Sequence, residues 1–244
     1  MTQRRPLPQD LKFMAPVIVP DLIRIGKDWD GGYIISATSV DDATGMLSLG
    51  VNNDWSFDQE WRAQKPHDRI HAYDGTISPT RFDAGLRGSY QKFFGSQAEH
   101  FPVNVGATSC VGQSSFDDVM IRMNRDRVFL KMDIEGGEWQ LTDAIMQHAS
   151  AITGAVIEFH NTHSLRDLFC ATMRRYQEHF HIIHIHPNTS CGYAQDNFPT
   201  VVEISFLNRD LWSGTDRRLE CHIADLDQPN LPNTEDVALY WTAP

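Results

Sequence analysis

Acidic, amide and histidine side chains follow apolar runs at four places in this 244-residue chain. The four polar segments are residues 50–54 (GVNND), 74–76 (DGT), 133–138 (DIEGGE) and 158–161 (EFHN). In an open parallel sheet, ligands bind outside the carboxyl ends of the strands. Carboxylate and imidazole groups can accept hydroxyl hydrogens, remove a proton or hold a hard divalent cation. We therefore expect a polar, mostly acidic edge where these segments meet.

Four residues of the last two segments are candidates for proton removal, namely Asp133, Glu135, Glu158 and His160. An ordinary histidine titrates near neutrality, which suits a general base. Glu158 lies two residues before His160 and so points to the same side of a strand, which lets the two act as a pair. Asp133, Glu158 and His160 can instead hold Mg²⁺ or Mn²⁺, and the sequence leaves both roles open.

Asp74 lies 24 residues after Gly50. That offset is close to the roughly 20 residues at which an acid in a first βαβ unit binds the ribose hydroxyls of an adenosine cofactor. Residues 50–54 contain one glycine where a dinucleotide-binding loop has three, which favours a cofactor without phosphates over NAD or FAD. A plain turn at residues 74–76 fits the spacing equally well.

Other polar groups have structural explanations. Glu138 suits the start of a helix, where an acid stabilises the helix dipole. Lys131 lies within an apolar strand and should pair with an acid of a neighbouring strand. Strict alternation places His184 and His186 on one face of a strand and His181 on the other, so we expect satisfied edge-strand histidines rather than a zinc site.

The composition excludes several classes of protein. The chain has 21 Lys and Arg against 32 Asp and Glu, a formal net charge of −11, which argues against a general nucleic-acid surface. Its start, MTQRRPLPQD, lacks the apolar run of a secretory signal. No uncharged apolar run approaches the roughly 18 to 20 residues of a membrane span. We expect a cytoplasmic protein without a transmembrane segment, and the oligomeric state stays open.

Strand-like and helix-like segments alternate along the chain. Strands are predicted at residues 22–26 and 32–36, which form a hairpin, and at 45–50, 69–75, 101–107, 154–160, 181–187 and 200–208. A further strand is predicted in residues 128–138, which end in an acidic glycine turn. Helices are predicted from Ser56, behind a Ser115 cap, after residue 138 and over residues 165–180. This alternation indicates a doubly wound α/β fold with a mostly parallel sheet. We divide the chain into an N-terminal arm (1–20), a single domain (21–212) and an acidic tail of poor periodicity (213–244).

The chain also resembles a known family in several segments. They are LSLGVNNDWSFDQEW, IHAYDGT, VFLKMDIEGGEW, AVIEFHN and the closing HIIHIHPN with PTVVEISFLNR. These segments are similar to the FkbM-type S-adenosylmethionine-dependent methyltransferases, in particular the bacterial branch near sugar-polymer gene sets. KMDIEGGE resembles the Lys-x-Asp-x-Glu-Gly-x-Glu signature of that family in full, whereas GVNND departs from the glycine-rich first motif of most methyltransferases.

The resemblance implies a Rossmann-like class I methyltransferase fold, with seven strands, the last antiparallel, and helices on both faces. It implies S-adenosylmethionine over the ends of the first two strands, with residues 104–108 and Asp117 or Asp118 at the adenine end. The cofactor contacts that it implies are Gly50, Asn52, Asn53, Asp54, Ser56, Asp74, Gly75 and Thr76.

The expected reaction is O-methylation of a hydroxyl on a sugar, a glycan or a glycan precursor, as in polysaccharide biosynthesis. One of Asp133, Glu135, Glu158 and His160 would then act as the base, with a divalent cation as an optional helper. Two alternatives remain open: methylation of a small non-sugar metabolite, and a non-catalytic binding module that keeps the fold.

Overall fold

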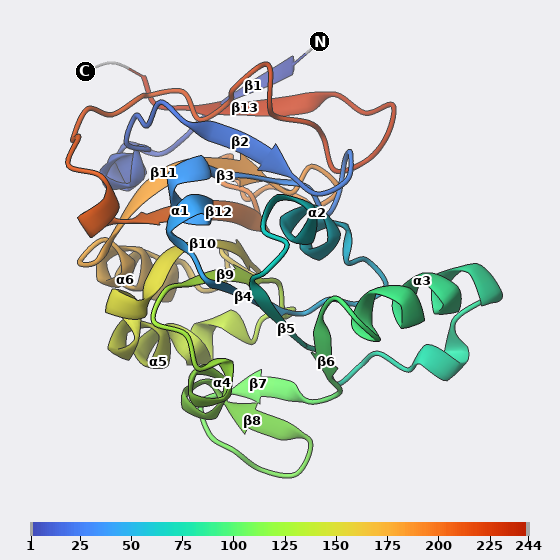
Figure 1. Cartoon of the computed structure of the whole chain (residues 1–244). Helices are drawn as coiled ribbons and strands as arrows, with labels where there is room; N and C mark the ends of the chain where they lie inside the picture. Colours follow the sequence, from blue (N-terminus) through green and yellow to red (C-terminus); the bar gives the residue numbers. More distant parts are fainter. Residues whose placement is uncertain (1, 243–244) are drawn as a thin grey trace.

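A seven-stranded sheet forms the centre of the computed structural model, which describes residues 2–242 (Figure 1). In spatial order its strands are β11 (Phe180–Pro187), β12 (Val202–Asn208), β10 (Ile152–Phe159), β9 (Val128–Met132), β4 (Gly45–Leu49), β5 (Arg69–Tyr73) and β6 (Glu99–Phe101). β12 is antiparallel to both of its neighbours, and the other pairs are parallel. The predicted fold class, including the antiparallel last strand, is confirmed.

The strand order reverses between β4 and β9. From β4 the chain moves outward through β5 to β6, and then returns to β9 on the other side of β4. The carboxyl ends of β4 and β9 therefore flank the crevice in which ligands of open α/β sheets bind. Both strands are buried along their whole length, as expected of central parallel strands.

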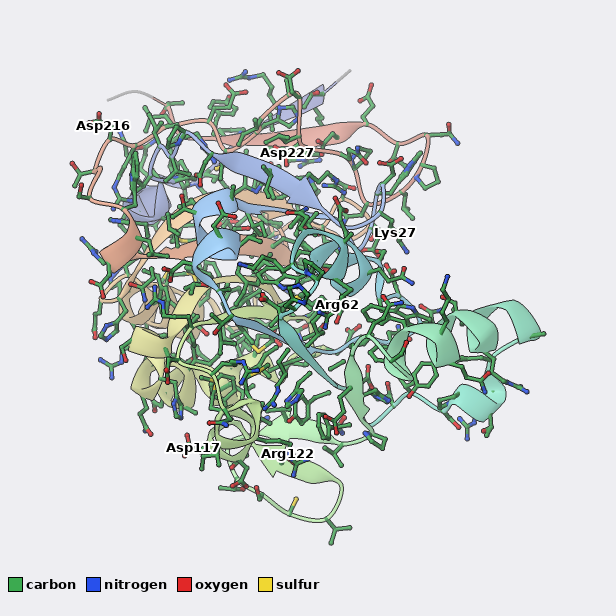
Figure 2. All side chains as sticks on the ribbon, in the orientation of Figure 1. Lys27, Arg62, Asp117, Arg122, Asp216 and Asp227 are labelled. Atoms are coloured by element: carbon green, nitrogen blue, oxygen red, sulfur yellow. The ribbon has the colours of Figure 1, made fainter. Side chains whose placement is uncertain are left out.

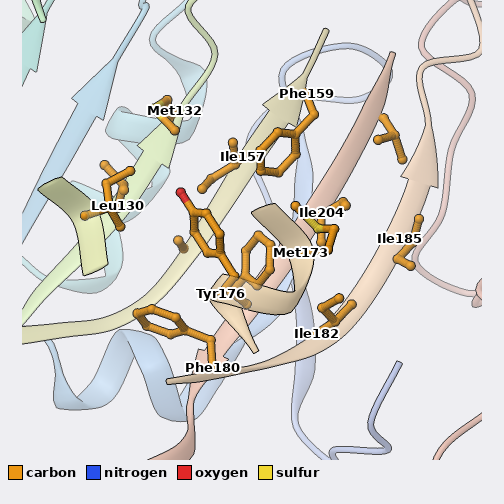
Figure 3. Packing of buried hydrophobic residues seen from close by; sticks show 14 of the residues in the cluster. Leu130, Met132, Ile157, Phe159, Met173, Tyr176, Phe180, Ile182, Ile185 and Ile204 are labelled. Atoms are coloured by element: carbon orange, nitrogen blue, oxygen red, sulfur yellow. The ribbon is translucent and has the colours of Figure 1, made fainter. Parts of the chain in front are cut away.

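Helices cover both faces of the sheet. α1 (Ala37–Asp42), α2 (Ser56–Gln64) and α3 (Ala84–Phe94) follow the first strands, and α2 and α3 pack on one face through a cluster that includes Trp61 and Phe129. α4 (Phe116–Met123), α5 (Thr142–Gln147) and α6 (Arg166–Tyr176) pack on the other face. Figure 3 shows this second cluster, in which Tyr176 of α6 lies against the residues of β9 and β10.

The predicted helix starts are partly right. Ser115 caps α4 as expected, because its Oγ accepts the backbone N–H of Asp118 at 3.1 Å. Ser56 does not cap α2. Its own N–H is instead accepted by Oδ1 of Asp54 at 3.0 Å, so that the aspartate two residues earlier satisfies the first free donor of the helix.

Two sequence segments form more elements than predicted. The expected strand at 101–107 divides at Pro102, which cannot donate to a ladder, into β6 and β7 (Asn104–Gly106). β7 pairs in parallel with β8 (Gln113–Ser115) beside α4. The helix expected after residue 138 begins as a 3₁₀ turn, η3 (Glu138–Leu141), before α5, and a second turn, η4 (Ala149–Ala151), follows α5.

The two ends of the chain pair with each other, which the sequence did not indicate. β1 (Thr2–Pro6) runs parallel to β13 (Asp236–Tyr240), with Thr2 opposite Asp236. The N-terminal arm and the tail therefore form one layer above the sheet (Figure 1). The remaining turns are η1 (Gln9–Met14), η2 (Pro79–Arg81) and η5 (Arg209–Leu211). The predicted hairpin is confirmed as β2 (Leu22–Ile25) antiparallel to β3 (Tyr33–Ser36).

Within residues 2–242, no helix is both long enough and apolar enough to span a bilayer.

Candidate functional site

A cavity of about 410 Å³ lies at the carboxyl ends of β4, β5 and β9, at the point where the strand order reverses. The turn of the β2–β3 hairpin closes one side, and the segments at Asn104 and Gln113 close another. Asn104 and Val105 thus reach the cavity as the family resemblance implied. Asp117 and Asp118 do not line it; they bind His148 and Ser109 instead.

The loop after β4 approaches β9 so closely that only glycine fits at position 50. Gly50 has a φ of +76°, and a Cβ atom there would lie 1.6 Å from the carbonyl oxygen of Asp133. Lys131 holds the loop by donating from Nζ to the Gly50 carbonyl at 2.6 Å. The expected partner of Lys131, an acid of a neighbouring strand, is therefore wrong, because its hydrogen bond goes to a backbone carbonyl.

Asp74 fastens the same loop to the end of β5. Its Oδ2 accepts the N–H groups of Val51 (3.0 Å) and Asn52 (2.7 Å), and its Oδ1 accepts the N–H and the hydroxyl of Thr76. Burial opposes ionisation of Asp74, but these hydrogen bonds outweigh it and lower the pKa of the carboxyl. Four acceptor positions are already filled, so a ribose hydroxyl has to replace or share one of these bonds.

Replacing Asp74 by alanine should lower the free energy of unfolding at pH 7 by about 2 to 4 kcal/mol, because three backbone N–H groups lose their acceptor. The lowered pKa means that this stabilisation is present above the unfolded-state pKa of about 3.9 and is lost as the pH falls below it. Urea unfolding between pH 3 and 7 measures both effects. Asp30→Ala, which lines the same cavity, is the matched control; equal losses in both variants would contradict this role of Asp74.

The other predicted cofactor residues divide into two groups. Gly50, Asn52, Asn53, Asp54, Asp74 and Thr76 line the cavity. Ser56 and Gly75 do not: the Ser56 hydroxyl accepts the N–H of Lys27 at 3.2 Å, and the Gly75 N–H is bound by Asn104. Asp54 also pairs with Lys27 at 2.8 Å, so it joins this loop to the β2–β3 hairpin.

The turn after β9 depends on Glu138, which is completely buried. Its Oε2 accepts the N–H of Gly136 at 2.8 Å, while its Oε1 accepts the N–H of His160 at 2.6 Å and lies 3.3 Å from His160 Nδ1. Glu138 therefore joins the turn to the end of β10 and orients the imidazole. The helix-dipole role expected for Glu138 does not account for these contacts; the sequence signal for them is its place as the last acid of KMDIEGGE.

Four carboxylates surround His160. Its Nδ1 faces Glu138, and its Nε2 lies 3.4 Å from Glu135, 3.8 Å from Asp133 and 3.9 Å from Glu158. We call these five residues the His160 cluster. Burial lowers the pKa of His160, but Glu138, Glu158 and Asp133 outweigh it and raise the pKa to about 9. This raised pKa favours the charged imidazole at neutral pH and argues against His160 as the base, which stays a prediction.

The carboxylates of the cluster differ in access to the cavity. Asp133 and Glu135 line the cavity, whereas Glu158 does not and is 4% exposed. Burial, together with the charges of Asp133 and Glu203, raises the pKa of Glu158, and Asn188 donates to its Oε1 at 2.9 Å. Burial also raises the pKa of Asp133, whose Oδ1 has no hydrogen-bond partner. Asp133 is thus the acid best placed to receive a proton.

The residues whose ligand atoms converge differ by one from the cation ligands predicted from the sequence. One ligand atom each from Asp133, Glu135 and His160 lies within 4.8 Å of the others. Glu135, whose backbone φ is +55°, lies nearer to His160 Nε2 than Glu158 does, at 3.4 Å against 3.9 Å. Glu158 accepts a hydrogen bond from Asn188 and does not line the cavity.

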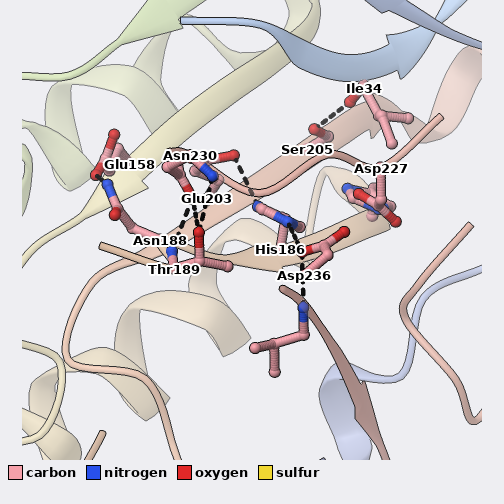
Figure 4. A network of polar contacts seen from close by, with 12 residues as sticks. Ile34, Glu158, His186, Asn188, Thr189, Glu203, Ser205, Asp227, Asn230 and Asp236 are labelled. Carbon is pink, nitrogen blue, oxygen red and sulfur yellow. Dashed lines mark hydrogen bonds and ion pairs between the residues drawn. The ribbon is translucent and has the colours of Figure 1, made fainter. Parts of the chain in front are cut away.

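A buried polar network joins the tail to β11 and β12 (Figure 4). His186 lies 3.0 Å from Asp236 and 3.4 Å from Glu203, and His184 lies 3.1 Å from Asp227. These histidines are satisfied, as expected. A β-bulge at Ile183 shifts the alternation by one residue, so His181 lies on the same side as His184 and His186, contrary to the prediction.

Asp236→Ala should lower the free energy of unfolding by about 2 to 4 kcal/mol, since it leaves His222 without a carboxylate partner and buried His186 with Glu203 alone. Hydrogen bonds to Asp236 raise the pKa of both histidines and lower that of Asp236. The effect should therefore be largest between pH about 4 and 6.5 and shrink on either side. Chemical unfolding across this range tests it, with exposed Glu235→Ala as the control; a loss that does not vary with pH would argue against the ion pairs.

Comparison with known proteins gives only distant likenesses. No protein-family model and no curated protein sequence matches the chain. An rRNA methylase from Streptococcus thermophilus aligns with a TM-score of 0.41 at 9% identity over 70% of this chain and 92% of that chain. A precorrin-6y C5,15-methyltransferase from Geobacter metallireducens aligns with a TM-score of 0.40 at 15% identity, over 70% of this chain and 87% of that chain. The StiE O-MT fragment aligns with a TM-score of 0.40 at 13% identity, over 70% of each chain. Similarity at this level does not identify an activity.

Proposed function

We propose that this protein is an S-adenosylmethionine-dependent O-methyltransferase of the FkbM type, acting on a hydroxyl of a sugar, a glycan or a glycan precursor. The observation that supports it most is an acidic cavity, without phosphate-binding groups, at the strand-order reversal. Its two lysines are both engaged, Lys27 with Asp54 and Lys131 with the Gly50 carbonyl. Such a cavity favours a cationic adenosine ligand over a dinucleotide.

The residues present fit S-adenosylmethionine. Asp30, Asp133 and Glu135 line the cavity with negative charge that suits a sulfonium, and the Asn52–Asn53 turn offers amide groups for the methionine part. When bound, the cofactor supplies an already activated methyl group. The protein then has to align an acceptor oxygen with that methyl and remove the hydroxyl proton.

Asp133 is the proposed base. With an acceptor hydroxyl aligned on the methyl group that the cofactor would supply, Asp133 would take the hydroxyl proton on its carboxylate. The His160 imidazolium, 3.8 Å away, holds the carboxylate in place, and Glu138 holds His160. Glu135 lies at the entrance, 83% exposed, where it can bind further hydroxyls of a sugar.

A second role for the His160 cluster is binding of Mg²⁺ or Mn²⁺ by Asp133, Glu135 and His160. The observation that favours it is the second shell: Glu138 holds Nδ1 of His160 while Nε2 faces the two carboxylates, as in many metal-binding histidines. A divalent cation there would position two hydroxyls of the acceptor and favour loss of a proton from one of them.

The deciding experiment is calorimetric titration with S-adenosylhomocysteine after chelation, followed by methyl transfer from labelled S-adenosylmethionine to a panel of sugars, glycan precursors and small non-sugar alcohols. We expect micromolar binding and label in the sugar acceptors. Label only in the non-sugar alcohols would reject the acceptor class, and no binding by folded protein would favour the non-catalytic module. Calorimetric titration with Mn²⁺ alone tests whether the His160 cluster binds a cation, and Glu135→Gln should then bind Mn²⁺ more weakly than wild type.

A further inference from the structure

A second pocket, of about 650 Å³, opens at the other end of β5 and β6. It lies beside Arg69, the first residue of β5, whereas the cofactor cavity begins at Tyr73, the last. Four residue steps of a strand span about 13 Å, so the two sites open at opposite edges of the sheet. The wall of the second pocket is built from β5, β6, the end of α4 and the turn after α3.

The pocket is basic in a protein of net charge −11. Its lining includes four arginines, Arg62, Arg69, Arg122 and Arg125, together with His67 and His71. Glu99 is the carboxylate in that lining, and Asp68 lies nearby. So concentrated a positive charge is not expected by chance on an acidic surface, and it favours an anionic ligand.

These arginines lack acidic partners. Among residues 2–242, the arginines with a carboxylate within 4.0 Å are Arg4, Arg127, Arg166 and Arg175, none of which lines the pocket. Arg62 is used structurally, because it donates to the carbonyls of Lys65, Pro66 and Gln97. Figure 2 labels Arg62 and Arg122, which approach the pocket from α2 and α4.

Three guanidinium groups keep donors free. Arg69 uses one amino group on the Met123 carbonyl, Arg125 uses one on the Asn124 carbonyl, and Arg122 lies 4.8 Å above the ring of Phe101. Each guanidinium has five N–H groups, so most remain available. Stacking of Arg122 on Phe101 fixes its plane and leaves its edge free for an oxyanion.

His71 is a second and independent sign of an unfilled site. It lines the pocket, is 3% exposed, and its Nδ1 has no hydrogen-bond partner. Burial and then the charges of Arg69, Arg122 and Arg125 lower its pKa to about 4, so it stays neutral. His71 Nε2 lies 3.6 Å from Glu99, so the buried Nδ1 is the polar atom of this side chain left without a partner, which a bound ligand can satisfy.

We propose that this pocket binds a small ligand carrying two or more phosphate groups, held by Arg69, Arg122 and Arg125. Guanidinium forks match phosphate oxygens in bidentate geometry, and three of them exceed the charge of one phosphate. The site does not depend on methyl transfer, since it shares no residue with the cofactor cavity.

The test is calorimetric titration of the whole chain at low salt with inorganic tripolyphosphate, with ATP, and with a short single-stranded RNA. We expect tripolyphosphate or ATP to bind, and Arg122→Gln and Arg125→Gln each to weaken binding about tenfold or more. Glu99→Gln should strengthen binding, because it removes the opposing carboxylate. The charge-matched control is exposed Arg81→Gln, which should leave the affinity unchanged.

Equal affinity for tripolyphosphate and ATP would show that the site recognises phosphates alone, and preference for ATP would add the nucleoside to the ligand. Binding of RNA alone would overturn the small-ligand proposal. So would an absence of binding at low salt, or equal effects of Arg122→Gln and Arg81→Gln. Thermal unfolding of each variant verifies that it is folded.

Discussion

Asp133→Asn should slow methyl transfer by about 10²- to 10⁴-fold while leaving the affinity for S-adenosylhomocysteine within a few-fold of wild type. Asparagine keeps the size of the side chain but cannot take up the hydroxyl proton. Asp133 lines the cavity and has a carboxylate oxygen without a hydrogen-bond partner, so the substitution breaks no hydrogen bond of the fold. Single-turnover transfer of labelled methyl, with calorimetry of the same sample, separates chemistry from binding.

The matched control is Asp30→Asn, an acid that lines the same cavity from the β2–β3 hairpin and lies outside the His160 cluster. It should change turnover by much less than Asp133→Asn. A similar loss in both variants would mean that the negative charge of the cavity matters and that Asp133 is not the base. A loss of S-adenosylhomocysteine affinity as large as the loss of turnover would place Asp133 in binding instead.

Glu138→Ala should lower the free energy of unfolding by about 3 to 5 kcal/mol, the larger of the stability effects expected here. The substitution removes a completely buried carboxylate, and with it the acceptor for two backbone N–H groups and the partner of the His160 imidazolium. Urea unfolding followed by circular dichroism measures it. Because alanine also leaves a cavity, Glu138→Gln provides a variant of nearly native volume.

Glu135→Gln is the control for position, since it lies in the same turn and its side chain is 83% exposed. It should change stability by no more than about 0.5 kcal/mol. The loss of stability in Glu138→Gln should lie between the losses in Glu138→Ala and Glu135→Gln. If Glu138→Ala were as stable as wild type, the turn after β9 would be held by other contacts, and the positioning of His160 by Glu138 would be wrong.

Much of the fold follows from the sequence because central parallel strands have a strong pattern. GMLSL and VFLKM are apolar on both faces, and each is followed by glycine or acidic residues, so both strands and their ends are readable. The division of the 101–107 segment can also be predicted, because Pro102 cannot donate a hydrogen bond to a neighbouring strand. The pairing of β1 with β13 cannot be predicted in this way, since each strand is five residues long and its partner lies more than two hundred residues away.

The candidate site is only partly readable. The strand ends locate the cavity, because parallel strands end at one edge of the sheet. The hydrogen-bond partners of the site residues cannot be predicted from residue spacing. They depend on the left-handed backbone at Glu135, on the close approach of the loop to β9 at Gly50 and on the burial of Glu138. The bulge at Ile183 likewise changes the face of a histidine without any signal in the strand HIIHIHP. The ordinary pKa of histidine is a poor guide at His160, because four carboxylates surround the imidazole and its pKa is raised.

The pairing of β1 with β13 also sets an order of assembly. The first strand of the chain is synthesised long before its partner, and Asp227 and Asp236, which neutralise the buried histidines of β11, are also made late. A sheet that collapses before the tail is made therefore leaves His184 without its carboxylate, whereas His186 already has Glu203. Joining segments so far apart in the chain is slow, since loop closure grows more costly with length. We expect the docking of the tail and the closure of the parallel pair to come last in folding.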